Sequence, residues 1–420
     1  MFINPLVKYS HQMSELKLPE FPAELTLAIA CSRWPFSKSV DRDIETIARS
    51  PIDWNGFLAW VRRNGVTPLV YHNFRRTRCS LVPEAVLAQL QGEAARNTRR
   101  VLVQIAEAAR ITRLLADAGI GSLIIKGPVL SLLAFGDLSL RQSRDIDLML
   151  DPARVLEADR LITQAGYRRV RPEVELTQPL FEVYQRWRGQ SAYYLDSSDV
   201  ILEIHWRLTS NSLLFPFDAA TLRSSAQQVR VAGTTFATFS DEALFLYLCV
   251  HGSVHFWFRL KWVTDIAALL YRLGPEVIDG VASSAQMLGL HRPFHAALIL
   301  AHKLMVAPVP IDILTQAHED RSATKLAIAG HRALNWNRSA GEPSETLWFN
   351  TWLSWHAFGL KPGLRYRWRE FQTQMWSPED WARVRLPIFL YLPLRPLSWV
   401  ARKIYRLISR RSVSSPILDP

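Results

Sequence analysis

The sequence contains only three cysteines, Cys31, Cys79 and Cys249, and they lie far apart along the chain. None of them belongs to a Cys-x-x-Cys pair, so the spacing indicates neither a zinc site nor a redox pair of that type. A few scattered thiols are typical of proteins in a reducing compartment. We therefore expect a cytoplasmic protein.

The chain also lacks the apolar run of about 18 residues that a membrane-spanning helix needs. Its first residues, Met-Phe-Ile-Asn-Pro, include no basic patch followed by an uninterrupted apolar run, so no signal peptide is indicated. Internal repeats and low-complexity tracts are absent. A phosphate loop of the Gly-x-x-x-x-Gly-Lys-Ser type is absent too, which argues against a kinase built on that motif.

Acidic residues are missing from one long stretch near the C-terminus. The formal net charge is +12, and residues 383–411 contain eight Lys or Arg and no acid, interleaved with aromatic residues. This composition is compatible with binding to an anionic membrane surface or to an RNA backbone, and the first would place the protein at the inner face of the membrane. Equally, it is compatible with a solvated basic face on a C-terminal helix that docks through its aromatic side chains, and three prolines interrupt any long helix here.

What the chain does have is enough apolar sequence, 49% of 420 residues, for two or three packed units. Apolar residues recur at helical spacing before residue 118 and again after residue 241, with a strand-rich stretch between them. We predict an α+β protein whose mixed sheet is flanked by N- and C-terminal helical regions. The predicted divisions are a helical region (1–118), a catalytic core (119–237), a helical domain (238–382) and a basic aromatic tail (383–420).

Within the predicted core the hydrophobic period switches between two and 3.6 residues. Strands are expected at 122–126, 145–150, 167–170, 191–195 and 200–208, and helices at 128–135 and 152–165. In the C-terminal region we predict helices over 243–273, 275–288, 293–305 and 322–334.

Two aspartates on the second predicted strand are the first chemical signal. Asp145 and Asp147 alternate with Ile146, so both point to one face of the strand, roughly 6 to 7 Å apart. Glu203 follows on a later predicted strand. Three carboxylates so placed can hold Mg²⁺ or Mn²⁺, although Asp-x-Asp at a strand end is also common as a solvated turn.

These residues belong to a longer pattern. The chain carries Lys126-Gly127, then Arg141-x-Ser143-x-Asp145-Ile146-Asp147, then Glu203-Ile204-His205-Trp206, and finally a His251-Gly252-x-x-His255 string that runs on to Trp262. This pattern resembles the DNA polymerase β-like nucleotidyltransferase superfamily, and within it the bacterial family of uncharacterised nucleotidyltransferases. The matching strings span residues 126 to 265.

The resemblance implies roles for individual residues. Asp145 and Asp147 would bridge the metal ions, and Glu203 would complete the metal site on the nucleophile side. Lys126, Gly127, Ser131, Arg141 and Ser143 would contact the nucleotide. The chain departs from the superfamily pattern at Pro128, where a serine or glycine is usual, and so lacks one hydroxyl and one N–H of the phosphate cradle.

Three histidines and two cations complete the candidate site. His205 shares a strand face with Glu203, so it either positions the acceptor, as a neighbour of the metal ligands, or is a structural histidine. His251 and His255 stand four apart on a helix, but Gly252 and Ser253 follow where a zinc protease needs a glutamate. That helix, with Arg259 and Lys261 downstream, is expected to offer positive charge to a triphosphate, unless these side chains only cover the helix surface.

The favoured hypothesis is a metal-dependent enzyme that moves a nucleoside monophosphate from a nucleoside triphosphate to an unidentified acceptor, whether small molecule, protein or RNA. The alternative is a catalytically inactive nucleotide-binding or scaffold protein of the same fold. The presence of all three carboxylates favours the enzyme.

Overall fold

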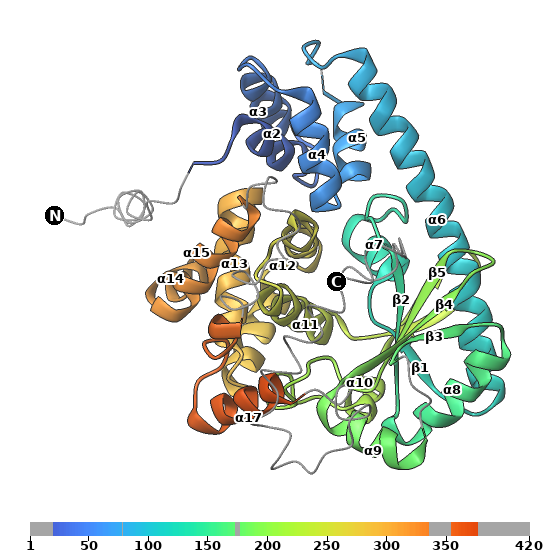
Figure 1. Ribbon diagram of the computed structural model, residues 1–420. Coiled ribbons are helices and arrows are strands. Elements are labelled where there is room, and N and C mark those ends of the chain that lie inside the picture. The colour runs from blue at the N-terminus through green and yellow to red at the C-terminus, as the bar shows by residue number, and fades with distance from the viewer. Residues whose placement is uncertain (1–19, 78, 173–176, 336–353, 377–420) are drawn as a thin grey trace, which may run out of the picture.

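The structure of the protein is a computed structural model that describes residues 20–77, 79–172, 177–335 and 354–376 (Figure 1). It confirms the predicted α+β class: a mixed seven-stranded sheet is flanked by helices from both ends of the chain. The predicted basic aromatic tail, residues 383–420, lies outside the described residues. The proposed domain boundaries stay predictions.

The N-terminal part consists of helices, as the sequence periodicity predicted. They are α2 (Ala23–Cys31), α3 (Lys38–Ala48), α4 (Trp54–Asn64), α5 (Thr67–Phe74) and α6 (Glu84–Asp117). Local signals set the ends of α4: Asp53 accepts a hydrogen bond from the Asn55 amide, and Gly65 ends the helix with φ of +66°. The long helix α6 runs from the N-terminal helices down beside the sheet (Figure 1).

Seven strands form one sheet in the order β3-β4-β5-β2-β1-β7-β6. Their bounds are β1 (Ser122–Ile124), β2 (Asp145–Leu150), β3 (Arg168–Arg171), β4 (Gln190–Leu195), β5 (Val200–His205), β6 (Gln227–Val231) and β7 (Thr234–Thr238). The central pair, β2 and β5, is parallel, with Asp147 directly beside Glu203. Strands β1 to β5 confirm the predicted ones, and β5 ends at His205, three residues earlier than expected.

The hairpin of β6 and β7 was not predicted. Its strands are short and rich in Gln and Thr, so they lack the run of apolar residues that marks the other strands. Its turn, Ala232-Gly233, has positive φ at both residues, the conformation of a tight hairpin turn. Because the turn is not the familiar Asn-Gly or Asp-Gly, the sequence marks it weakly.

Helices cover both faces of the sheet and divide the interior into two apolar cores. On one face, α6, α8 (Val155–Gln164) and α9 (Gln178–Trp187) pack against Ile146, Leu148 and Ile204. On the other, α7 (Gly127–Phe135) and the C-terminal helices pack against Leu123 and Met149. A 3-10 turn (Pro152–Arg154) precedes α8, and α10 (Ala219–Ser224) follows β5. Because strand side chains alternate, Asp145 and Asp147 face the second core.

The C-terminal helices are α11 (Asp241–Val254), α12 (Leu260–Met287), α13 (His291–Met305), α14 (Ile311–Glu319), α15 (Arg321–Leu334) and α17 (Leu364–Met375). The predicted continuous helix over 243–273 is wrong, because the chain breaks between α11 and α12. Phe256 and Trp257 adopt positive φ there, and the buried Trp257 ring folds back over Gly252, where any Cβ would lie 2.3 Å from it. The expected interruption before Pro275 is present as a kink at Gly274.

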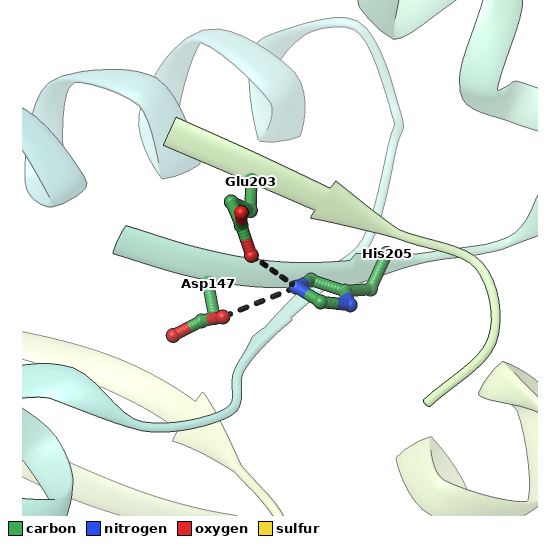
Figure 2. Close-up of side chains that lie close together, drawn as sticks. All are labelled: Asp147, Glu203 and His205. Carbon is green, nitrogen blue, oxygen red and sulfur yellow. Dashed lines mark hydrogen bonds and ion pairs between the residues drawn. The ribbon is translucent and has the colours of Figure 1, made fainter. Parts of the chain in front are cut away.

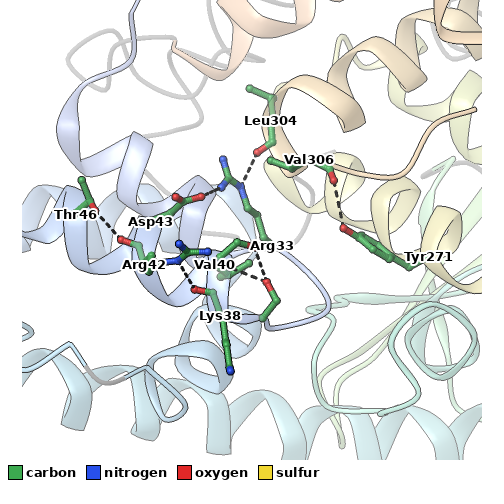
Figure 3. A network of polar contacts seen from close by, with 11 residues as sticks. Arg33, Lys38, Val40, Arg42, Asp43, Thr46, Tyr271, Leu304 and Val306 are labelled. Atoms are coloured by element: carbon green, nitrogen blue, oxygen red, sulfur yellow. Dashed lines mark hydrogen bonds and ion pairs between the residues drawn. The ribbon is translucent and has the colours of Figure 1, made fainter. Parts of the chain in front are cut away.

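Arg33 joins the N-terminal helices to the C-terminal ones. Its Nε donates to the carbonyl of Leu304, 3.2 Å away at the end of α13, and its guanidinium pairs with Asp43 of α3 (Figure 3). Tyr271 of α12 donates to the carbonyl of Val306 nearby, at 3.2 Å.

Within the described ranges, no helix combines the length and the apolar character that crossing a membrane requires.

Candidate active site

Three side chains from two neighbouring strands converge on one face of the sheet. Nε2 of His205 lies 3.1 Å from Oδ1 of Asp147 and 3.4 Å from Oε2 of Glu203 (Figure 2). One ligand atom from each of the three lies within 4.8 Å of the others. The group follows from the register, because Asp147 and Glu203 are paired across the parallel strands and His205 lies two residues farther along the same face.

Asp145 lies two residues before Asp147 on that face and is half-buried. It is not a member of the compact group, whose third member is His205. The predicted metal ligands Asp145, Asp147 and Glu203 thus share two residues with the group that the fold brings together. The hypothesis that His205 neighbours the metal ligands agrees with this arrangement.

A lysine supplies positive charge to the same carboxylate. Nζ of Lys126 lies 3.4 Å from Oδ1 of Asp147. Burial opposes its charged form, but Asp147 and the other carboxylates more than offset this and raise the pKa of Lys126 above its usual value. The next residue, Gly127, has φ of +70° and begins α7, so a side chain there would be strained.

The electrostatics separate the two aspartates. Burial opposes ionisation of Asp147, yet Lys126 and His205 hold its pKa well below the usual range. Burial and then the charge of Asp147 raise the pKa of Asp145. For His205, burial favours the neutral ring, but hydrogen bonds with Asp147 and Glu203 raise its pKa to about 9. At neutral pH His205 and Lys126 are therefore both positively charged beside the carboxylates.

The residues fit a divalent cation. Oδ2 of Asp147 is buried and has no hydrogen-bond partner among the described residues. A buried carboxylate oxygen without a partner is costly, and a bound cation would remove that cost. Carboxylates suit Mg²⁺ and Mn²⁺, while the imidazole of His205, once it gives up its proton, would widen the choice toward transition metals.

Three residues predicted to bind the nucleotide are already engaged in shaping the loop before β2. Ser131 Oγ donates to the Asp137 carbonyl at 2.7 Å and accepts from the Arg141 amide. Ser143 Oγ donates to the carbonyl of Asp145 at 3.1 Å. Arg141 is buried in an ion pair with Asp265 of α12, in which its Nε donates to both carboxylate oxygens, at 2.9 and 3.1 Å. These contacts give the three side chains a structural role and leave their predicted contact with nucleotide untested.

His251 and His255 lie together near the end of α11, with ring centroids 4.7 Å apart. Both pack against the indole of Trp262. Burial and then the charge of Lys126 lower both pKa values, that of His255 to about 4. Both rings are therefore neutral at physiological pH.

The two predicted cations lie at the start of α12. Arg259 occupies the N-cap position of the helix without a capping hydrogen bond from its side chain, and its guanidinium lies over the Phe258 ring. Burial, and then the charges of Arg141 and Arg259, lower the pKa of Lys261 to about 7. The charges of Lys261 and Asp145 each shift the pKa of the other toward its charged form, and the predicted contact of Lys261 with nucleotide stays a prediction.

Two residues of this site were missed in the sequence. Asp265 holds Arg141, and the buried Tyr247 interacts electrostatically with Lys126 and Asp147; burial raises its pKa to about 12. Helical spacing carried a signal for both, because Tyr247 precedes His251 by four residues and Asp265 follows Lys261 by four.

Comparison with known proteins agrees with the geometry. No curated protein matches the chain. The model of a family described as uncharacterised nucleotidyltransferases matches residues 50–306, which covers the N-terminal helices from α4, the whole sheet, and α11 to α13. A match over more than half of the chain shows that this protein belongs to the uncharacterised nucleotidyltransferase family.

Proposed function

We propose that the protein transfers a nucleoside monophosphate from a nucleoside triphosphate to an acceptor, with a divalent cation held by Asp147, Glu203 and Asp145. The parallel pairing of β2 and β5 carries the proposal: it places two carboxylates side by side, one with a buried oxygen that lacks a partner. Membership of a nucleotidyltransferase family supports the same chemistry.

When bound, the cation would neutralise charge on the reacting phosphate oxygens. Lys126 would hold Asp147 ionised and ready to bind it. Among the three grouped side chains Glu203 is the most accessible, 16% exposed against 5% for His205 and 0% for Asp147. We therefore propose that Glu203 is the base that accepts the proton of the acceptor hydroxyl.

The nucleotide side of the site would be formed by the turn at Gly127 and the cations of α12. At Gly127 the absence of a side chain lets a phosphate approach the backbone at the start of α7. Lys261 and Arg259 would contact the β- and γ-phosphates, which leave as pyrophosphate when the acceptor oxygen bonds to the α-phosphorus. The acceptor is a hydroxyl or phosphate of a small molecule, a protein or an RNA.

The test is pyrophosphate release from each of the four nucleoside triphosphates with Mg²⁺, in the presence of cell extract as a source of acceptor. Asp145→Asn and Asp147→Asn remove charge with little change in volume, and each should lower transfer by several orders of magnitude. Asp117→Asn, at an exposed residue of α6 outside the site, is the matched control. Unchanged turnover in either site variant would refute the proposal, and Mg²⁺-dependent nucleotide binding with no release from any nucleotide would favour the inactive alternative.

A further inference from the structure

Helix α17 buries the aromatic ring of Tyr366 in the core but leaves three large apolar side chains exposed. The side chains that it buries against the protein are Tyr366, Glu370 and Thr373. Large apolar side chains point outward instead: Leu364 is 82% exposed, Trp368 62% and Phe371 45%. A surface helix of a globular protein normally buries its apolar stripe. The exposed stripe therefore needs an explanation outside the described fold.

Specific contacts set this orientation. Asn211, which follows β5, donates to Oε2 of Glu370 at 2.9 Å. The guanidinium of Arg369 donates to the Arg186 carbonyl at 3.0 Å and lies 4.5 Å from the ring centre of Trp187. Turning the apolar side chains inward would break these contacts. The helix is thus held by the segment after β5 and by the end of α9, and it lies at the edge of the molecule, below the other C-terminal helices (Figure 1).

The outward side chains form a continuous stripe at positions i, i+4 and i+7 of the helix. The rings of Trp368 and Phe371 are stacked, with centroids 5.6 Å apart. Trp355 is 78% exposed on the neighbouring segment, which Gln374 holds through the Ser354 carbonyl at 2.9 Å. Clustered aromatic side chains left in water mark an interaction surface.

The charges beside the stripe indicate the partner. Arg365 and Arg367 are exposed on the same helix, and its one acidic residue, Glu370, is buried against Asn211. Downstream in the sequence, residues 383–411 add eight Lys or Arg and no acid. Tryptophan and phenylalanine flanked by arginine, without acids, are the composition of helices that lie in the interface of an anionic bilayer.

We propose that Leu364, Trp368 and Phe371 of α17 insert into the surface of an anionic lipid bilayer, with Arg365 and Arg367 on the headgroups. This surface is independent of the carboxylate site. The hydrogen bonds of α17 with Asn211 and Arg186 would then hold the rest of the protein against the membrane.

Flotation of the full chain with phosphatidylcholine vesicles, with and without phosphatidylglycerol, tests the proposal. The parent should float with the anionic vesicles only. Replacing Leu364, Trp368 and Phe371 together by Ser should lower the bound fraction on the order of tenfold or more, because each side chain loses its apolar burial. The matched control replaces Leu102, Met287 and Ile311 by Ser. These side chains lie on other helices and are exposed to a similar degree as those of the stripe, so this variant should bind as the parent does. The double variant Arg365→Glu with Arg367→Glu should also weaken binding. Added salt should weaken binding of the parent in the same way, because it screens the attraction between the arginines and the headgroups.

Three results would overturn the proposal: a parent that does not float, a Ser variant that floats as the parent does, and equal losses in the Ser variant and its control. Light scattering of the same samples tests whether the stripe instead binds a second copy of the chain. If the stripe variant only abolishes self-association, the surface joins two copies of the chain. Circular dichroism confirms that each variant is folded, and the arginine pair carries the test should the Ser variant be unfolded.

Discussion

At the scale of single residues, the site is a balance between buried charges of opposite sign. Asp147, with a side chain fully buried, is ionised because Lys126 and His205 lie within 3.4 Å of its Oδ1. Glu203 lies 3.4 Å from the imidazole and is 16% exposed. The two carboxylates therefore differ in environment: Asp147 is enclosed between two cations, and Glu203 is partly accessible to an incoming group.

This difference predicts the effect of Glu203→Gln, which should impair transfer more than it impairs binding of the Mg²⁺-nucleotide. The amide keeps the volume but cannot accept the acceptor's proton, so kcat should fall on the order of a hundredfold or more. Calorimetric titration of nucleotide, run beside single-turnover kinetics, separates the two effects. Glu319→Gln, at an exposed residue of α14, is the control. Lost binding with normal chemistry per bound nucleotide would show that the assigned role is wrong.

Lys261 predicts a pH dependence of nucleotide affinity. Its pKa of about 7 means that the amine is charged below that pH and neutral above it. Raising the pH through this value should therefore raise KM for the nucleoside triphosphate, on the order of tenfold for one lost charged contact, with little change in kcat. Lys261→Arg keeps its charge and should flatten the profile, and Lys261→Ala should have the high KM throughout. Arg259→Ala should raise KM at every pH, and unchanged KM in both Ala variants would assign the two residues to the helix surface.

At the scale of elements, one buried ion pair ties the loop before β2 to α12. Arg141 and Asp265 are 124 residues apart, their side chains are 5% and 1% exposed, and Nε of Arg141 donates to both carboxylate oxygens of Asp265. The loop leads directly into Asp145, so the pair also fixes the entry to the strand that carries the two aspartates. Its strength lies in the cost of separating the partners, because either charge left alone in the interior would be uncompensated.

Asp265→Asn should therefore destabilise the protein by about 3–5 kcal/mol, since it leaves the Arg141 guanidinium buried without its counter-charge. The double variant Arg141→Met with Asp265→Leu removes both charges and should lose less. Chemical denaturation followed by circular dichroism compares the three midpoints. A single variant as stable as the parent would show that the pair contributes nothing, and a double variant less stable than the single one would contradict the desolvation argument.

The elements also show what the sequence could predict. Strands β1 to β5 were predictable because buried apolar residues alternate or run together, and the Asp-x-Asp alternation placed two carboxylates on one face. The break at 255–259 was not, because Trp257 closes over Gly252 only in the folded chain. Neither was the pairing of Arg141 with Asp265, because helical spacing places Asp265 beside Lys261 but an ion pair across 124 residues leaves no local pattern. His205 was predicted as a neighbour of the carboxylates, and its place between them depends on the pairing of β2 with β5.

At the scale of the whole molecule, positive charge is in excess and unevenly placed. The formal net charge is +12, and eight of the basic residues fall in 383–411, outside the described residues. Long-range attraction of a polyanion depends on such clusters more than on the total, because salt screens separated charges within about 10 Å. The tail and the arginines of α17 would then act on one anionic surface, while the stripe of α17 supplies the apolar contact.

Charge reversal of Arg402, Lys403, Arg406 and Arg410 to Glu tests the part played by the tail, since it spares the aromatic residues that a docked helix would need. We expect weaker association with both anionic vesicles and RNA, and a smaller dependence on salt, because fewer counterions are released. The control reverses Arg96, Arg99, Arg100 and Arg113, four exposed residues of α6, and so has the same net charge. Binding measured across a salt series separates the cases: equal losses in both variants would indicate an effect of total charge alone. A tail variant that binds both polyanions as the parent does at low salt would make the tail a structural element, and the stripe of α17 would then account for any membrane binding by itself.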